Sequence, residues 1–372
     1  MGEQTIYWAA AGFEAARRLD EVATEERQRG LHGHSFRVEL QHRVPGSAPD
    51  CAPAPHHDLQ QRLQEVLSLL DYQLLNDRLP QPTDRRVLHW IVQQLNLPGA
   101  THCKLWVGPR QGVIRDWTGQ WHSWRRDRFE AAHRLPHVPA GHQCGRMHGH
   151  GFQVQLQWQS TDEARIQALQ AHWQVLRQTL HQRCLNQVAG LEIPTSEMIS
   201  RWIWLALKPS APELGAVTIF ETATCGAVFN GLEHGIWKDH SFDSATVLET
   251  QGPSAWSKGG MTPVGEALTP ADEQIYGHTY VLRLGLVAPV EPLLGWTVDF
   301  GDVKALFAPV LACLDHQPLH EVLALRTHSQ LTRWVYEQAC LQLGALRRVS
   351  LWDTPDTGYT LEQDAHVFAL TG

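Results

Sequence analysis

One segment of this 372-residue chain occurs three times, and only the middle copy keeps a full set of metal-ligating histidines. The corresponding positions in chain order hold Arg17, His32 and His34, then His133, His148 and His150, then Thr246, Tyr276 and His278. A repeat of this kind predicts a fold built from similar units, here residues 1–118, 119–230 and 231–372. The unequal decay of the copies predicts that the chemistry is concentrated in fewer sites than there are units.

The composition argues against several classes of protein. A formal net charge of -8 gives no electrostatic support for nucleic-acid binding. The seven cysteines lack paired spacing, which favours a reducing compartment over a disulfide framework. We find no N-terminal signal-like segment and no run of about 18 apolar residues that could span a bilayer. These features predict a cytoplasmic protein that binds neither nucleic acid nor membrane.

Strands are predicted beside each histidine motif. After the middle motif, residues 152–159 alternate strictly between apolar and polar side chains, which is typical of a strand with one buried face. The other two copies repeat the pattern at Phe36, Val38 and Leu40, and at Tyr280, Leu282, Leu284 and Leu286. The Phe-Glu-Ala-Ala-His segment predicts an adjoining strand. Pro and Gly between Val44 and Pro55 predict a surface connection inside the first unit.

Helices are predicted after the strands. In the second unit, apolar residues recur at spacings of three and four and form one stripe: Ile166, Leu169, Trp173, Leu176, Leu180 and Cys184. A second helix is expected to begin near Thr83, Thr195 and Thr327 in the three units. Each unit is expected to end on a strand, at residues 101–107, 216–221 and 348–353.

The middle copy predicts a zinc site. His148 and His150 are two residues apart on a strand, so their side chains project to the same face, and His133 on the adjoining strand supplies a third imidazole. Three neutral histidines suit Zn²⁺ and leave a fourth position open, as in catalytic sites. Cys144 can act as a base or nucleophile, or can close the site as a fourth ligand. Arg17 in the first unit would repel a cation, so one zinc per chain is expected.

The residues Phe129 to Leu156, with their C-x-x-x-H-G-H spacing, resemble the 6-pyruvoyl-tetrahydropterin synthase family, and above all its 6-carboxy-tetrahydropterin synthase branch in the queuosine pathway. The likeness extends through Ile193 to Trp204, Val217 to Gly226 and Gly295 to His320. The resemblance implies an α+β tunnelling fold (T-fold) of antiparallel strands with two helices per unit. In this family three subunits close a twelve-strand barrel. One chain here would therefore form a pseudo-trimeric ring, as a monomer or a homodimer of two rings.

The resemblance also implies roles for individual residues. His133, His148 and His150 match zinc ligands, Cys144 matches a catalytic cysteine, and Glu221 matches a pterin-binding carboxylate. Thr195 and Glu197 match further pterin contacts, although helix capping alone would also explain them.

An Asp-His pair that assists proton transfer in the family comes from the neighbouring subunit. The corresponding pairs here are Asp71-Tyr72, His181-Gln182 and Asp315-His316. Only the third unit keeps both residues, so the working site is predicted to be shared between the second and third units.

The predicted activity is the zinc-dependent conversion of 7,8-dihydroneopterin triphosphate to 6-carboxy-5,6,7,8-tetrahydropterin, with loss of triphosphate and acetaldehyde. This makes the chain a lyase with a small-molecule pterin substrate and a Zn²⁺ cofactor. One alternative is a related pterin lyase that makes the 6-pyruvoyl compound or only cleaves the side chain. Another is a pseudoenzyme that binds a pterin or purine without turnover.

Overall fold

Twelve antiparallel strands form a closed barrel in this computed structural model, which describes residues 3–19, 29–43, 55–247, 275–363 and 367–368. The first unit contributes β1 (Gln4–Arg17), β2 (His32–Arg43), β4 (Thr101–Val107) and β5 (Gln111–Arg115). The second contributes β6 (Trp121–His133), β7 (His148–Trp158), β9 (Leu214–Thr222) and β10 (Cys225–Phe229). The third contributes β11 (His234–Val247), β12 (Ile275–Val287), β14 (Leu346–Thr354) and β15 (Thr357–Glu362).

The barrel closes through three seams between units. Strand β5 pairs with β6, β10 with β11, and β15 with β1, all in antiparallel register. Each barrel strand in the described residues therefore has two neighbours, which removes the free edges that would otherwise invite aggregation. One chain thus supplies the ring that the sequence predicts.

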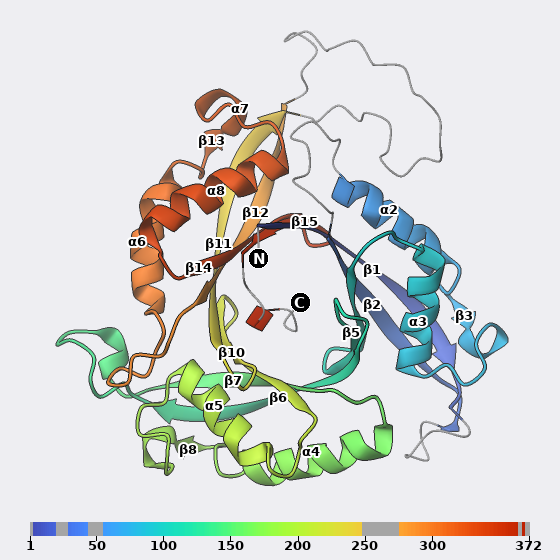
Figure 1. Ribbon diagram of the computed structural model, residues 1–372, viewed down its shortest axis with the longest axis horizontal. Coiled ribbons are helices and arrows are strands. Elements are labelled where there is room, and N and C mark those ends of the chain that lie inside the picture. The colour runs from blue at the N-terminus through green and yellow to red at the C-terminus, as the bar shows by residue number, and fades with distance from the viewer. Residues whose placement is uncertain (1–2, 20–28, 44–54, 248–274, 364–366, 369–372) are drawn as a thin grey trace.

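The helices lie outside the ring of strands (Figure 1). They are α2 (Pro55–Ser68), α3 (Asp84–Leu95), α4 (Glu163–Arg177), α5 (Ser196–Leu207), α6 (Phe300–Ala312), the short α7 (Leu319–Val322) and α8 (His328–Gln342). Three apolar clusters, one for each unit, fill the space between the helices and the barrel. In α5 the buried stripe is Ile199, Ile203 and Leu207, which recur every four residues. Inside the ring, Val367 and Phe368 pack against Ala216 and Val228.

The second helix of each unit begins where the sequence predicts. Thr83, Thr195 and Thr327 are the N-cap residues of α3, α5 and α8, and each side chain accepts a hydrogen bond from the backbone N–H of the third helical residue. Thr327 and Gln330 form a complete capping box. These caps fix the helix N-termini, which lie next to the ends of the strands that carry the histidine motifs.

Two details differ from the sequence-based prediction. Helix α4 ends at Arg177, so Leu180 and Cys184 of the predicted apolar stripe lie beyond it, and Cys184 belongs to the two-residue strand β8 (Arg183–Cys184). Each unit also has a further short strand, β5, β10 or β15, after the strand predicted to be its last. The connection between Val44 and Pro55 lies largely outside the described residues. No helix in the described ranges is long and apolar enough to cross a membrane.

Candidate metal centre at the seam of the second and third units

Three histidine side chains meet at one end of the strands of the second unit. His133 ends β6 and lies opposite His148, the first residue of β7, while His150 follows two residues later on the same strand. One ligand nitrogen from each ring lies within 4.8 Å of the others. The structure therefore brings together the three residues that the sequence predicts as zinc ligands.

Hydrogen bonds orient these imidazoles toward a shared point. His133 Nδ1 lies 2.8 Å from the carbonyl oxygen of Pro194, and His148 Nδ1 lies 2.8 Å from that of Arg146. When Nδ1–H donates to a carbonyl, the Nε2 lone pair is free to bind a metal. The Nε2 atoms of His133 and His150 are buried without a hydrogen-bond partner among the described residues. The donor set therefore fits a divalent cation such as Zn²⁺.

Burial keeps two of these histidines neutral. Removal from water lowers the pKa of His133 and that of His150, because it disfavours the charged imidazolium. Neutral imidazole is the form that binds metal, so the site does not need to release protons from these two rings before a cation enters.

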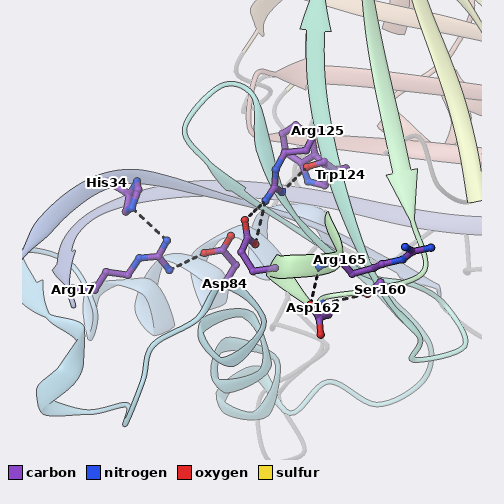
Figure 2. A network of polar contacts seen from close by, with 9 residues as sticks. Arg17, His34, Asp84, Trp124, Arg125, Ser160, Asp162 and Arg165 are labelled. Carbon is purple, nitrogen blue, oxygen red and sulfur yellow. Dashed lines mark hydrogen bonds and ion pairs between the residues drawn. The ribbon is translucent and has the colours of Figure 1, made fainter. Parts of the chain in front are cut away.

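The corresponding position in the first unit contains a guanidinium instead of a metal site (Figure 2). Arg17 Nη1 lies 2.7 Å from the Asp84 carboxylate, and Nη2 lies 3.3 Å from His34 Nε2. Burial opposes ionisation of Asp84, but the charge and hydrogen bond of Arg17, together with other nearby cations, lower its pKa. The positive charge of Arg17 thus lies beside His34, where a metal ion would carry the positive charge in a histidine site.

We expect Arg17→His to create a metal site in the first unit. The substitution removes the internal cation and supplies a third imidazole beside His32 and His34, with the Asp84 carboxylate close by. Zinc content, measured by elemental analysis after removal of excess metal, should rise by one ion per chain. Arg18→His is the matched control, because Arg18 is the exposed neighbour of Arg17. Unchanged zinc content in Arg17→His would contradict the interpretation.

The predicted pterin-binding carboxylate lies beside the histidine cluster. Glu221 is near the end of β9, and its Oε1 lies 3.5 Å from His150 Nε2. Ser196 Oγ, at the first position of α5, donates a hydrogen bond to Glu221 Oε2. Ser196 is not among the site residues predicted from the sequence, although its place directly after the N-cap Thr195 is a usable signal.

Cys144 lies on a short 3₁₀ turn, Gln143–Gly145, that precedes His148 in the chain, and Glu221 and Asp299 are near enough to act on it electrostatically. Its backbone carbonyl accepts a hydrogen bond of 2.8 Å from Leu135 N, which ties the turn to the chain that leaves β6. Burial raises the pKa of the thiol, and the negative charges of Glu221 and Asp299 raise it further. At this centre the group of mutually close ligand atoms contains the three histidines and not Cys144.

The third unit completes the surroundings of this centre with residues 295–299. Thr195 Oγ1 donates to the carbonyl oxygen of Gly295, and Glu197 Oε1 accepts from both the backbone N–H and the hydroxyl of Thr297 at 2.8 and 3.0 Å. Asp299 Oδ2 lies 3.6 Å from the Nε2 of His142 on the loop that carries Cys144. The site is therefore composite, with contacts from two units.

The sequence motifs do not predict these individual contacts, although the sequence carries a signal for them. The third unit resembles the family through the segment that begins at Gly295, and the second unit has no counterpart of that segment. The glycine is required by the close approach: its φ is 75°, and a Cβ at this position would lie 2.8 Å from Ile193 Cγ2. Glycine at position 295 thus allows this segment of the third unit to pack closely against the second unit.

Glu197 gives a prediction about pH. Burial raises its pKa from 4.5 to about 7, despite the two hydrogen bonds from Thr297. A carboxyl whose pKa is higher in the folded state stabilises the fold fully below pH 4.5, and this contribution is lost as the pH rises through about 7. Glu197→Gln removes the ionisation but keeps an acceptor for Thr297. Relative to the parent, the variant should therefore gain about 2 kcal/mol in unfolding free energy between pH 5 and pH 8.

Chemical denaturation at pH 5 and pH 8 measures this difference. Glu233→Gln, at an exposed position in the third unit, is the control and should show no such change. If Glu197→Gln differs from the parent by the same amount at both pH values, the carboxyl does not titrate in this range.

The structure does not bring Asp315 and His316 into contact with the histidine cluster. Asp315 Oδ1 accepts a hydrogen bond of 3.0 Å from Asp243 N on β11, and the side chain of His316 is 77% exposed. No polar contact recorded in the described residues joins either residue to the cluster. The side chains of the equivalent residues in the other units, Asp71 and His181, likewise accept a hydrogen bond from a backbone N–H on the first strand of their own unit.

A closed barrel of three similar units, with a cluster of three histidines at the seam of the second and third units, defines a pseudo-trimeric ring with a candidate metal centre at that seam. The model of the 6-pyruvoyl tetrahydropterin synthase family matches residues 6–105, 123–232 and 235–364, and the chain belongs to this family. The fold and the three-unit arrangement predicted from the sequence are thereby confirmed.

Individual relatives match single units. A 6-carboxy-5,6,7,8-tetrahydropterin synthase from Synechocystis sp. is 34% identical over 120 residues, which cover 29% of this chain and 91% of the relative. A dihydroneopterin monophosphate aldolase from Pyrococcus furiosus is 28% identical over 93 residues, which cover 24% of this chain and 80% of the relative. Among solved structures, 6-pyruvoyl tetrahydropterin synthase from Caenorhabditis elegans aligns with a TM-score of 0.29 at 20% identity, covering 35% of this chain and 95% of that chain.

Proposed function

We propose that the chain is a zinc-dependent lyase that converts 7,8-dihydroneopterin triphosphate to 6-carboxy-5,6,7,8-tetrahydropterin. The observation that carries the proposal is the cluster of His133, His148 and His150 with the Glu221 carboxylate beside it. The two relatives that match single units are both named as pterin enzymes. Zinc, when bound, would supply Lewis-acid polarisation of the oxygens on the substrate side chain.

Protein groups would hold the pterin ring and move the proton. Glu221 is the carboxylate next to the cluster, and a carboxylate can accept two parallel hydrogen bonds from the ring N–H and the amino group of a pterin. Ser196 holds this carboxylate in place through its hydroxyl. Glu197 and Thr195 are engaged by the third unit, so they support the pocket by fixing the seam.

Cys144 is the proposed proton-transfer group. Without a cation its thiol is kept protonated by burial and by neighbouring carboxylates, which raise its pKa. A dication bound by the three histidines would oppose those negative charges and favour the thiolate. Asp315 and His316 are proposed to relay the proton onward, in accordance with the family resemblance.

The carboxy product is favoured over its alternatives by two observations. The C-x-x-x-H-G-H spacing from Cys144 to His150 is the spacing associated with the 6-carboxy branch, and the relative with 34% identity carries that branch's name. The relative named as an aldolase makes simple side-chain cleavage the second candidate.

Product analysis tests the proposal. Purified zinc-loaded protein is incubated with 7,8-dihydroneopterin triphosphate, and 6-carboxy-tetrahydropterin, acetaldehyde and triphosphate are expected. The 6-pyruvoyl compound, or a pterin that has merely lost its side chain, would support the related lyases. Saturable binding without any new pterin would support the pseudoenzyme. A His148→Ala, His150→Ala variant, which lacks two ligands of the cluster in the second unit, serves as the control and should form no product.

We also expect a particular oligomeric state and cellular compartment for this chain. One chain closes the barrel, so a monomer or a dimer of two rings is expected and a trimer of chains is not. The six cysteines in the described part of the chain are free thiols, which suits a reducing cytoplasm.

A further inference from the structure

A second group of metal-ligating side chains lies at the seam between the third and first units. It consists of His57 on α2, His328 at the start of α8 and Asp353 on β14. Their ligand atoms all lie within 4.8 Å of one another. His57 Nε2 is 3.2 Å and His328 Nε2 is 3.8 Å from the same carboxylate oxygen, Asp353 Oδ2.

These residues are not the decayed copy of the first centre. At the family positions the third unit has Thr246 and Tyr276 in place of two histidines. His328 instead follows the N-cap Thr327, as Ser196 follows Thr195, and Asp353 corresponds to Glu221. His57 comes from the neighbouring unit. The new ligand set therefore occupies the pocket region of the third unit, but its three main ligands stand at other positions than the histidines of the first centre.

The surroundings of Asp353 direct one oxygen toward the histidines. Its Oδ1 accepts hydrogen bonds from Thr357 Oγ1 at 2.6 Å and from Thr354 N at 3.0 Å. These bonds fix the carboxylate, so that Oδ2 faces His57 and His328. Hydrogen-bonded support of this kind is typical of carboxylates that bind metals.

A fourth histidine extends the group. The ring of His278 lies 5.6 Å from that of His328, and His278 Nε2 is buried with no hydrogen-bond partner among the described residues. An ion pair between Asp353 and one protonated histidine would leave this nitrogen unused. A metal ion can accept all of these donors at once without a proton on any of them.

We propose that His57, His328 and Asp353, with His278 beside them, bind one divalent transition-metal ion at the seam between the third and first units. Two imidazoles and a carboxylate suit Zn²⁺ or Fe²⁺ and leave positions open for His278 or water. The ion links α2 to β14 across the junction of the first and last units. It therefore stabilises the closed ring by binding only its folded form. This raises the expected metal content from one to two ions per chain.

Metal stoichiometry tests the site. The full chain is stripped with a chelator, reloaded with Zn²⁺ or Co²⁺, freed of excess ion and analysed for metal. The parent should hold two ions, His57→Ala one, the His148→Ala, His150→Ala variant one, and the combination none. His57 is exposed, so its truncation removes no core packing. His172→Ala, which changes an exposed histidine on the outer helix α4, is the matched control and should hold two ions.

Thermal unfolding separates a metal site from a plain ion pair. With metal bound, His57→Ala should unfold several degrees below the parent, and without metal the two should unfold at the same temperature. If the unfolding temperatures of His57→Ala and the parent differ by the same amount with and without metal, the proposal is overturned. The contact between His57 and Asp353 would then be a plain ion pair. Asp353→Asn provides a second variant, because its amide oxygen can still accept from Thr357. Two ions bound in both variants would also overturn the proposal.

Discussion

Cys144→Ala should remove detectable turnover of the pterin substrate and leave zinc in place. Loss of a positioned acid–base group costs roughly 10² to 10⁴ in rate. Zinc should stay because the mutually close ligand atoms of the cluster come from the three histidines alone. Two backbone carbonyls orient His133 and His148 without any help from the thiol. Product formation tests the loss of turnover, and zinc content, measured by elemental analysis on the same preparation, tests the retention of the metal.

Cys184→Ala is the matched control for this experiment. Cys184 is a half-buried cysteine of the same unit, on β8, and its thiol contacts Asn186 rather than the cluster. It should retain both activity and zinc. Loss of most zinc from Cys144→Ala would make the thiol a fourth ligand. Full activity in that variant would show that another group moves the proton.

Local patterns in the sequence were sufficient to predict the histidine cluster. Two histidines separated by one residue share a face of any strand, and antiparallel pairing of neighbouring strands places His133 opposite His148. The helix starts at Thr195 and its two counterparts were predictable for a similar reason, because an N-cap acts within a few residues. Features determined by short-range geometry could thus be read from one sequence.

Contacts across the seams could not be predicted in this way. Glu197 bonds to Thr297, exactly one hundred positions later in the chain, and His57 approaches Asp353 from the other end of the chain. No periodicity or spacing links residues so far apart, and their meeting depends on how the ring closes. The short strand β5 was missed for another reason: its five residues are too few for alternation to stand out.

His316→Ala should lower turnover by about 10² or more and leave zinc content unchanged, if His316 relays the proton from Cys144. The residue belongs to the unit that supplies Thr297 and Asp299 to the centre, and its side chain is 77% exposed and free to exchange protons with solvent. Histidine is the side chain best suited to pass protons under physiological conditions, and the first unit has a tyrosine, Tyr72, at the same position.

Tyr72→Ala separates this relay from a role in chain geometry. Tyr72 and His316 both adopt a left-handed backbone, with φ of 52° and 57°. Each donates its backbone N–H to the first strand of its unit at 2.6 Å, to Glu14 O and Asp243 O respectively. Truncation to alanine therefore disturbs the two turns equally, and only His316→Ala removes an imidazole. A loss of turnover confined to His316→Ala would assign a chemical role to the side chain across the seam. If turnover falls slightly and equally in both variants, His316 only helps to form the turn that anchors β11. Proton transfer would then depend on groups already beside the cluster.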